Sequence, residues 1–299
     1  MTGLASLAAV CVARLAERSP AVLRLLQSDF TGRWRVINEL RPNHLPENVL
    51  ANVNGIRMFV SFVDSVQRDA FFGHYEPDST RLLISLVRPG DVIIDVGANV
   101  GVITLQLARA LRGRGRVHAF EPSPEVNRQL KRNCSLNPEL QQLISVHDVA
   151  LGEVPGVMPF YAPVEEGGAG WGSLARFDDI ESNQVSVNVE TLDRMMEALG
   201  RPQIRVVKMD IEGFEVEALR GAKDTLAAQR IDYFVIEFNG GRLLERHVSW
   251  ADFIAPLQDA GYEPRFDLLD DETMREFRLG RLPAHEVMTN VCFARSGVR

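Results

Sequence analysis

A glycine-rich turn, and a carboxylate about twenty residues beyond it, are the groups in this chain best suited to chemistry. The apolar run Val92–Ile94 ends on Asp95, and Gly97–Gly101 follows, leading into apolar residues at helical spacing. This order predicts a buried strand, a tight turn and a helix. A second apolar run ends on Glu121 and Pro122, where a carboxylate can accept hydrogen bonds from both hydroxyls of a ribose.

The residues of the turn favour one nucleoside cofactor over another. A dinucleotide-binding turn reads G-x-G-x-x-G, but Asn99 and Val102 stand where its second and third glycines would be. Asp95 is unfavourable beside a pyrophosphate and suits an ammonium group. S-adenosylmethionine has an ammonium group, a ribose for Glu121, and a carboxylate for the N–H groups around Ala98 at the helix start. A nicotinamide-dependent oxidoreductase and a turn without a ligand are the alternatives.

Acidic residues also end two later apolar runs. Asp210 and Glu212 follow Val206–Met209, and Glu237 ends the run before Asn239. Ligands of open α/β sheets bind at the carboxyl edge of the strands, where these residues would lie. A carboxylate there can hold the amino group of the cofactor, as we expect for Asp210. It can also take the proton of an acceptor hydroxyl, so Asp210, Glu212 and Glu237 are the candidate catalytic residues.

A third apolar run ends near Asp148. A polar group at that edge can accept from the amino group of an adenine. We therefore expect the Asp148 side chain, with the backbone of Val149 or Ala150, to contact the cofactor.

The interval 154–190 is the longest stretch without a clear period, and it includes Trp171 and Ser173. Long irregular segments inside compact domains are usually lids or binding loops. The indoles of Trp171 and Trp250 offer flat faces for a sugar ring. His247 could reach an acceptor, although it could instead cap a surface helix. The candidate substrate contacts are therefore Trp171, Ser173, His247 and Trp250.

Several stretches resemble the FkbM family of S-adenosylmethionine-dependent O-methyltransferases. They are GDVIIDVGANVG, HAFEPSP, VALGE, VVKMDIEGFEVEALRGA, GHYEPDS and YFVIEFN. The resemblance covers about residues 55–295, and the segment around Asp210–Gly213 is its most specific part. It implies that Tyr75 and Glu76 contact the cofactor and that the acceptor is a hydroxyl of a sugar, polyketide or related metabolite. We favour a saccharide or glycoconjugate; a cofactor-binding subunit without catalysis is a further alternative.

Asp210, Glu237 and Asn239 would also supply three oxygen ligands suited to Mg²⁺. This set is similar to the Asp, Asp, Asn metal cluster of catechol O-methyltransferase-like enzymes. Lys208 lies on the same side of its strand as Asp210 and can balance that charge without an ion. Acid–base catalysis without a metal is therefore the favoured hypothesis, and a bound Mg²⁺ is the alternative.

These residues require a sheet whose strands alternate with helices. We predict a doubly wound, Rossmann-like class I methyltransferase fold, with residues 1–75 as a small helical and strand cap and residues 76–299 as the catalytic domain. The expected strands are 92–95, 117–121, 144–149, 204–210, 231–238, 262–266 and 290–294. The expected helices are 101–112, 124–136, 214–228 and 250–260.

Composition limits the partners and the location. The 299 residues are 45% hydrophobic with a net charge of −7 and no long run of like charges, which argues against a nucleic-acid partner. The three cysteines are scattered without metal-ligand spacing, as is typical of a reducing cytoplasm.

Residues 3–28 are predicted to be helical. One face carries Leu4, Leu7, Ala8, Cys11 and Leu15. The first apolar run is too short to span a bilayer and lacks the basic residues of a signal peptide. The face would pack on the body of the protein or on a second subunit of a homo-oligomer. Alternatively, the helices lie on a membrane surface and contact lipid head groups through three arginines, Arg14, Arg18 and Arg24.

Overall fold

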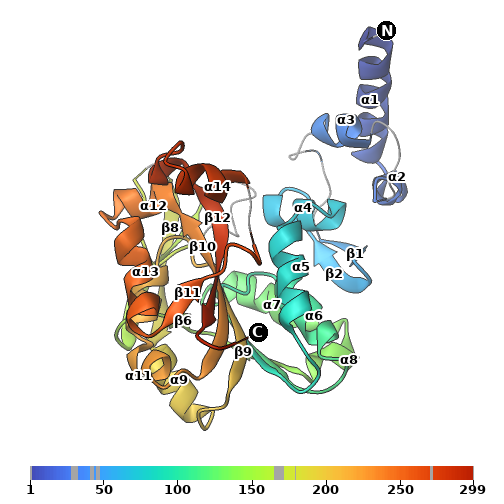
Figure 1. The fold of residues 1–299 in the computed structure, drawn as a ribbon. Coiled ribbons are helices and arrows are strands. Elements are labelled where there is room, and N and C mark those ends of the chain that lie inside the picture. The colour runs from blue at the N-terminus through green and yellow to red at the C-terminus, as the bar shows by residue number, and fades with distance from the viewer. Residues whose placement is uncertain are drawn as a thin grey trace. The chain divides into compact units, whose positions relative to one another are not determined.

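The computed structural model describes residues 2–27, 33–40, 44, 48–164, 172–178, 180–269 and 272–298. The chain divides into two compact units, the first ending at Pro77 and the second beginning at Asp78 (Figure 1). The first unit contains, in order, α1 (Thr2–Ala16), α2 (Pro20–Leu25), α3 (Arg33–Asn38), β1 (Val49–Val53), β2 (Ile56–Val60) and α4 (Ser65–Phe72).

The strand expected in the N-terminal cap is confirmed as β2, and it pairs with β1 in an antiparallel hairpin. The hairpin turns at Asn54 and Gly55, which have φ of 50° and 83°. A two-residue turn of this kind needs positive φ at both positions, which Asn and Gly tolerate. The N-terminal helices are confirmed, but Ala8, Cys11 and Leu15 on the expected packing face are exposed.

The second unit is built on a seven-stranded sheet. Its order is β11-β12-β10-β9-β3-β4-β5. The strands are β3 (Val92–Val96), β4 (Arg116–Phe120), β5 (Ile144–His147), β9 (Ile204–Met209), β10 (Ile231–Asn239), β11 (Tyr262–Pro264) and β12 (Met288–Arg295). All seven expected strands are present, so the predicted α/β fold is confirmed. The sheet is mostly parallel, and β12 runs antiparallel to β10 and β11.

Helices cover both faces of this sheet. Figure 1 shows α6 and α7 on one face and α9, α11 and α13 on the other. The helices of the unit are α5 (Pro77–Leu86), α6 (Val102–Ala110), α7 (Pro124–Ser135), α8 (Pro138–Gln141), α9 (Leu192–Ala198), α10 (Glu215–Arg220), α11 (Lys223–Ala227), α12 (Gly240–Glu245), α13 (Trp250–Asp259) and α14 (Glu272–Arg278), with a 3₁₀ turn at Ala284–Glu286. The helix expected over 214–228 is divided between α10 and α11 at Gly221, where a Cβ would lie 2.0 Å from the carbonyl oxygen of Gly152.

The interval 154–190 is more regular than the sequence indicated. It contains β7 (Gly156–Pro163) and β8 (Ser182–Glu190), which form a second sheet with β6 (Ala150–Leu151) in the order β6-β8-β7. The expected strand 144–149 ends earlier, at His147, because Ala150 and Leu151 pair with β8 instead. The polar–apolar alternation of Val185, Val187 and Val189 is the period-two signal of a half-buried strand.

The chain direction across the main sheet reverses between β3 and β9. From β3 the chain moves outward to β4 and β5, and then returns to β9 on the other side of β3. The carboxyl edge at such a reversal is where open α/β sheets bind ligands. Gly97 follows β3 at this point, with φ of +81°, and a Cβ there would lie 1.8 Å from the carbonyl oxygen of Asp210. Gly97 is therefore required by the close approach of two strand ends.

We expect Gly97→Ala to lower the melting temperature much more than Gly113→Ala. Both glycines have φ near 80°, with 81° at Gly97 and 82° at Gly113, so each alanine carries the left-handed cost of about 1–2 kcal/mol. A Cβ at Gly113 would meet nothing within 4 Å, whereas at Gly97 the Asp210 backbone must move, which adds about 1–3 kcal/mol. Thermal unfolding measures the difference, and equal shifts for the two variants would contradict this account.

Candidate active site

The N–H groups of the glycine turn are occupied within the protein. Gly97 and Ala98 both donate to the carbonyl oxygen of Phe120 at 3.0 Å, and Gly101 donates to Ala98 at 2.9 Å. Asn99 has φ of 50°, and its side-chain oxygen accepts from Val100 N–H at 2.7 Å. The turn therefore uses these N–H groups to bind β4 and itself, and contact of a cofactor carboxylate with the start of α6 stays a prediction.

Glu121 joins the turn to the end of β4. Its two oxygens accept the backbone N–H groups of Asn99 at 3.0 Å and Ser123 at 2.9 Å. The carboxyl is buried, and burial raises its pKa from 4.5 to about 7. Each carboxylate oxygen has a further lone pair, so hydroxyl donors can still be accepted. Pro122, partly exposed, lies between Glu121 and Ser123.

A buried lysine lies among the acids of β3 and β9. Lys208 Nζ is 3.0 Å from Asp210 Oδ2, as its place in the sequence indicated. The fully buried Asp95 accepts from the Thr104 hydroxyl at 2.5 Å. Burial raises the pKa of Asp95, and the nearby Lys208 partly opposes that rise. Contact between Asp95 and a cofactor ammonium stays a prediction, and the structure gives this carboxylate a part in the packing of β3 on α6.

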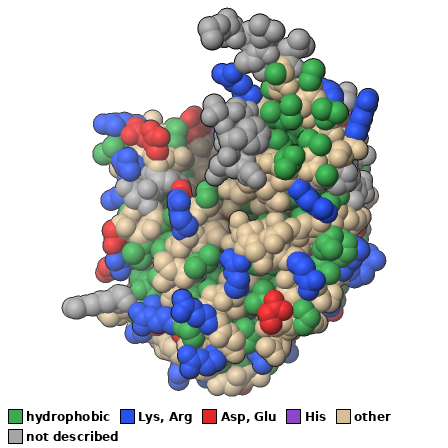
Figure 2. Space-filling model, turned by 90° about the vertical axis from the view of Figure 1, so that its right-hand side faces the viewer, with side chains coloured by type: hydrophobic (Ala, Val, Ile, Leu, Met, Phe, Trp, Pro, Cys, Tyr) green, Lys and Arg blue, Asp and Glu red, His purple; other side chains and the backbone are tan. Residues whose placement is uncertain are grey.

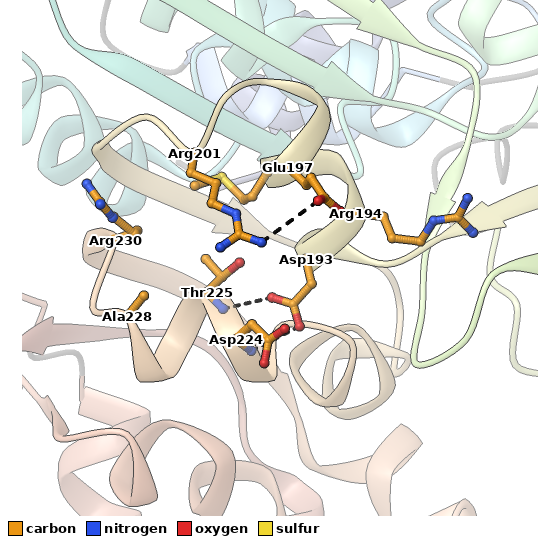
Figure 3. Close-up of a pocket in the computed structure, with 9 residues that line it drawn as sticks. Asp193, Arg194, Glu197, Arg201, Asp224, Thr225, Ala228 and Arg230 are labelled. Atoms are coloured by element: carbon orange, nitrogen blue, oxygen red, sulfur yellow. Dashed lines mark hydrogen bonds and ion pairs between the residues drawn. The ribbon is translucent and has the colours of Figure 1, made fainter.

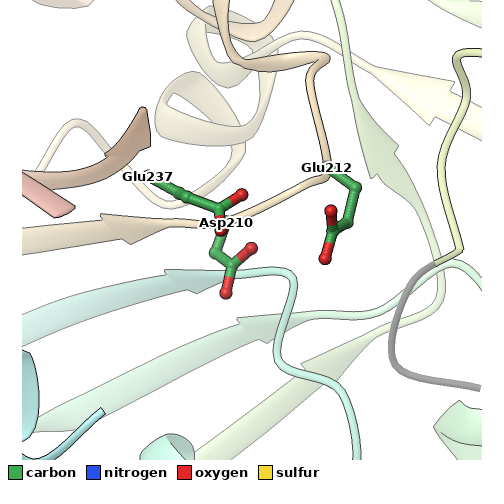
Figure 4. A group of neighbouring side chains, drawn as sticks. All are labelled: Asp210, Glu212 and Glu237. Atoms are coloured by element: carbon green, nitrogen blue, oxygen red, sulfur yellow. The ribbon is translucent and has the colours of Figure 1, made fainter. Parts of the chain in front are cut away.

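Asp210, Glu212 and Glu237 come together at the carboxyl edge of the sheet (Figure 4). One oxygen from each carboxylate lies within 4.8 Å of one from each of the others. Asp210 and Glu212 follow β9, and Glu237 is in β10. The structure thus brings all three candidate catalytic residues to one place.

Glu212 combines an unusual backbone conformation with a raised pKa. Its φ is 54°, a left-handed value uncommon for a residue other than glycine. Burial, and then the like charges of Asp210 and Glu215, raise its pKa to about 8, while Arg242 and Lys208 oppose the rise. A carboxyl with such a pKa is a stronger base than an exposed one once it is deprotonated.

The sequence reasoning did not single out Glu215, which holds the loop that carries Glu212. One Glu215 oxygen accepts N–H groups from Ile211 and Gly213, each at 3.1 Å. The other oxygen is buried and has no hydrogen-bond partner in the described part of the chain. Burial raises the pKa of Glu215 to about 7. Its signal in the sequence was the third acid of Asp210-Ile-Glu-Gly-Phe-Glu215.

Two arginines of the α12 region also went unnoticed. The guanidinium of Arg246 binds both oxygens of Glu217, at 2.6 and 3.1 Å, and donates to the carbonyl oxygen of Gly213. The guanidinium carbon of Arg242 lies 4.3 Å from the centre of the Phe177 ring. These contacts fix the far side of the Glu212 loop.

Asn239 does not join the acidic group as a ligand. Its side-chain oxygen accepts from Arg242 N–H at 3.2 Å and caps α12. The third carboxylate beside Asp210 and Glu237 is Glu212, and a metal bound at this edge stays a prediction.

The residues expected to contact a substrate have other roles in the structure. The buried Ser173 hydroxyl donates to the Glu212 carbonyl oxygen at 2.9 Å and accepts from Ala175 N–H at 3.0 Å. Trp250 stacks on Phe253 and meets the edges of two more Phe rings, so its faces serve packing. Both expectations are therefore corrected. His247 is exposed after α12, and Trp171 lies outside the described residues.

The remaining candidate cofactor contacts lie after the carboxyl end of β5 and in the first unit. Asp148 is exposed and Val149 partly exposed between β5 and β6, whereas Ala150 is buried in β6. Tyr75 and Glu76 belong to the first unit. Contact of these residues with a cofactor stays a prediction.

A separate cavity of about 200 Å³ lies between α9 and the α11 region, lined among others by Arg201, Thr225 and Arg230 (Figure 3). Arg201 and Arg230 precede β9 and β10, so the cavity is at the amino edge of the sheet. Its charges are compensated locally, as when Asp193 accepts two N–H groups of α11.

Comparison with known proteins identifies the family of the chain. The family model of the FkbM methyltransferase domain matches residues 95–264, more than half of the chain. The chain belongs to the FkbM methyltransferase family. Membership of this family supports S-adenosylmethionine, and not a nicotinamide, as the cofactor.

Two relatives are named as a hexuronic acid methyltransferase and a 2-O-methyltransferase. The chain is 29% identical over 169 residues to the hexuronic acid methyltransferase AglP of Haloferax volcanii, covering 56% of this chain and 63% of AglP. It is 26% identical over 170 residues to the 2-O-methyltransferase NoeI of Sinorhizobium fredii, covering 51% and 66%. The chain thus spans less than two thirds of each relative.

A solved FkbM methyltransferase from Methylobacillus flagellatus KT overlaps 78% of this chain and 53% of its own, with 15% identity and a TM-score of 0.44. The assignment of this chain to the FkbM family rests on the family model and not on this structural overlap.

Glu215→Gln should make the stability of the protein less dependent on pH. The folded pKa of Glu215, about 7, lies above its ordinary 4.5. The folded state therefore keeps a proton that the unfolded chain releases, and stability falls as pH rises from about 4.5 to 7. Gln cannot ionise and keeps an oxygen for Ile211 and Gly213. Urea unfolding at pH 5 and pH 8 measures the effect. The exposed Glu125→Gln serves as the control, and an unchanged pH dependence in Glu215→Gln would contradict the assignment.

Proposed function

We propose that this FkbM methyltransferase transfers the methyl group of S-adenosylmethionine to a hydroxyl oxygen of a saccharide or glycoconjugate. The observation that carries the proposal is the group of three carboxylates, Asp210, Glu212 and Glu237, beside the glycine turn at the reversal between β3 and β9. The name of AglP supports a sugar acid as the acceptor, and the name of NoeI supports an oxygen as the methylated atom.

The cofactor, when bound, supplies a methyl group on a positively charged sulfur. The residues of the edge suit such a cation, because Asp210, Glu212 and Glu237 are acidic. Glu121 would accept the ribose hydroxyls with the lone pairs that Asn99 and Ser123 leave available. Asp148 would receive the adenine amino group. The surplus of carboxylates at this edge is a reason to prefer a cationic cofactor over a pyrophosphate.

The chain's own part in the reaction is to position the acceptor and remove its proton. Positioning supplies most of the rate increase in a displacement of this kind. We assign the proton to Glu212, because its pKa of about 8 makes it a strong base and because Lys208 already pairs with Asp210. Glu237 and Asp210 would hold the hydroxyl and the cofactor in line.

A divalent cation is the alternative use of the same three carboxylates. Carboxylate oxygens are preferred ligands of Mg²⁺. Lys208 already supplies a buried positive charge to Asp210 at 3.0 Å. We therefore prefer the mechanism without a metal.

Glu121→Ala should weaken binding of S-adenosylmethionine by about 1.5–3 kcal/mol, the range for hydrogen bonds to a charged group. Calorimetry measures the affinity. Glu125→Ala on the neighbouring helix, whose side chain is exposed, is the matched control and should bind normally. Normal affinity in a folded Glu121→Ala protein would remove the ribose assignment.

Glu212→Gln should reduce turnover by about 10²–10⁴-fold, the usual effect of a positioned base. The base must be deprotonated, so wild-type turnover should rise with pH along a limb at or below the free-enzyme pKa of about 8, and Gln should abolish that limb. Turnover is measured as S-adenosylhomocysteine formed with a panel of uronic acids, neutral sugars and glycolipids, and mass spectrometry identifies the methylated product.

Two controls separate the possible outcomes for this site. Glu212→Gln should bind S-adenosylmethionine almost normally, which distinguishes a lost base from a lost cofactor. A chelator should leave wild-type turnover unchanged; loss that added Mg²⁺ restores would show a metal mechanism. A wild-type rate in Glu212→Gln would shift the role to Asp210 or Glu237, which Asp210→Asn and Glu237→Gln then test. If no sugar in the panel gives a methylated product, the saccharide proposal is contradicted.

A further inference from the structure

In the described part of helix α1, three alanines are buried while two larger apolar residues are exposed. Ala9, Ala13 and Ala16 are buried, while Val12 is 37% and Leu15 is 60% exposed. A helix on a globular core normally turns its larger apolar side chains inward, because the gain from burial grows with apolar area. The exposed face of α1 is therefore suited to an apolar environment outside this unit.

The next helix adds a second exposed leucine. In α2, Leu23 and the adjoining Leu26 are buried, whereas Leu25 is 66% exposed. Figure 2 shows hydrophobic side chains gathered in the upper part of the view, with Lys and Arg side chains at their border. No helix among the described residues is long and apolar enough to cross a membrane.

The charges on this face are of one sign. Within the described part of residues 8–40, every exposed charged side chain is an arginine, namely Arg18, Arg24 or Arg35. The Glu17 carboxylate is buried and pairs with Arg14. The chain as a whole carries a net charge of −7, so the N-terminal helices form a basic region on an acidic protein.

We propose that α1 and α2 bind the surface of a membrane that contains anionic lipids. Val12, Leu15 and Leu25 would enter the boundary between head groups and acyl chains, and Arg18 and Arg24 would meet the lipid phosphates. Basic residues around an exposed apolar face are the features of helices that lie in this interface. The 15 residues of α1 rise about 22 Å, less than the roughly 30 Å hydrocarbon core, so the helix lies on the membrane and does not span it.

Charge complementarity favours lipid over a second copy of the chain. A symmetric dimer through this face would bring its arginines toward those of the other copy, because the same patch faces itself across a twofold axis. Like charges placed opposite one another disfavour association. An anionic membrane pairs the arginines with phosphate and covers the leucines at the same time.

Co-sedimentation of the full chain with vesicles tests this proposal. Phosphatidylcholine vesicles with and without phosphatidylglycerol are compared. Binding should be at least about tenfold stronger with the anionic lipid, because each arginine near such a surface contributes about fivefold. Equal binding to both vesicle types, or no binding to either, would overturn the proposal.

Surface variants locate the contact. Leu15→Glu and Leu25→Glu should each weaken vesicle binding by about tenfold or more, because each removes a leucine that the lipid would bury in the bound state. Arg18→Gln with Arg24→Gln should remove most of the preference for anionic lipid. Leu279→Glu is the matched control, since Leu279 is 56% exposed in the second unit, and it should bind like the wild type.

Light scattering and cofactor titration complete the test. The wild-type protein could form a dimer that Leu15→Glu dissociates, while it does not bind vesicles. That result would show a second copy on this face and overturn the lipid proposal. Unchanged circular dichroism and cofactor affinity in the variants show that they are folded. Vesicle binding is measured without turnover, so its result does not depend on the proposed acceptor.

Discussion

The acidic edge of this member of the FkbM methyltransferase family depends on how closely two strand ends approach one another. Gly97, after β3, leaves so little room beside Asp210 that a Cβ would lie 1.8 Å from the Asp210 carbonyl oxygen. The Asp210 N–H in turn donates to the Val96 carbonyl oxygen at 3.0 Å. This contact sets the turn that holds Glu121 beside the loop that holds Glu212.

The same approach concentrates negative charge in a small buried region. Asp95 and Lys208 lie within it, and Lys208 pairs with Asp210. Burial raises the pKa values of Glu121 and Glu215 to about 7 and that of Glu212 to about 8. Such an edge is costly for the empty protein and favourable for a positively charged ligand, because a cation relieves the repulsion between the carboxylates. Perturbed acids of this kind are common where function requires them.

The irregular segments near the site act as supports. Ser173 binds the Glu212 carbonyl oxygen, Glu215 binds the N–H groups on both sides of Glu212, and Arg246 binds the Gly213 carbonyl oxygen. Together they hold Glu212 at its positive φ. Ser173 was expected to contact substrate, and its observed role is to position the loop that carries the candidate base.

The sequence alone determined the strand order along the chain, the glycine turn, and the three acids Asp210, Glu212 and Glu237, because apolar period and strand-end position are local properties. It also pointed to the family through those same residues. Only the tertiary structure decided that the turn N–H groups are used internally, that β12 is antiparallel, and that Asn239, Ser173 and Trp250 serve capping and packing. The Asn239 cap is a local contact with Arg242, but the other roles depend on partners far away in the chain, such as Phe120 for Gly97 or Phe277 for Trp250. Local sequence carries no record of such partners.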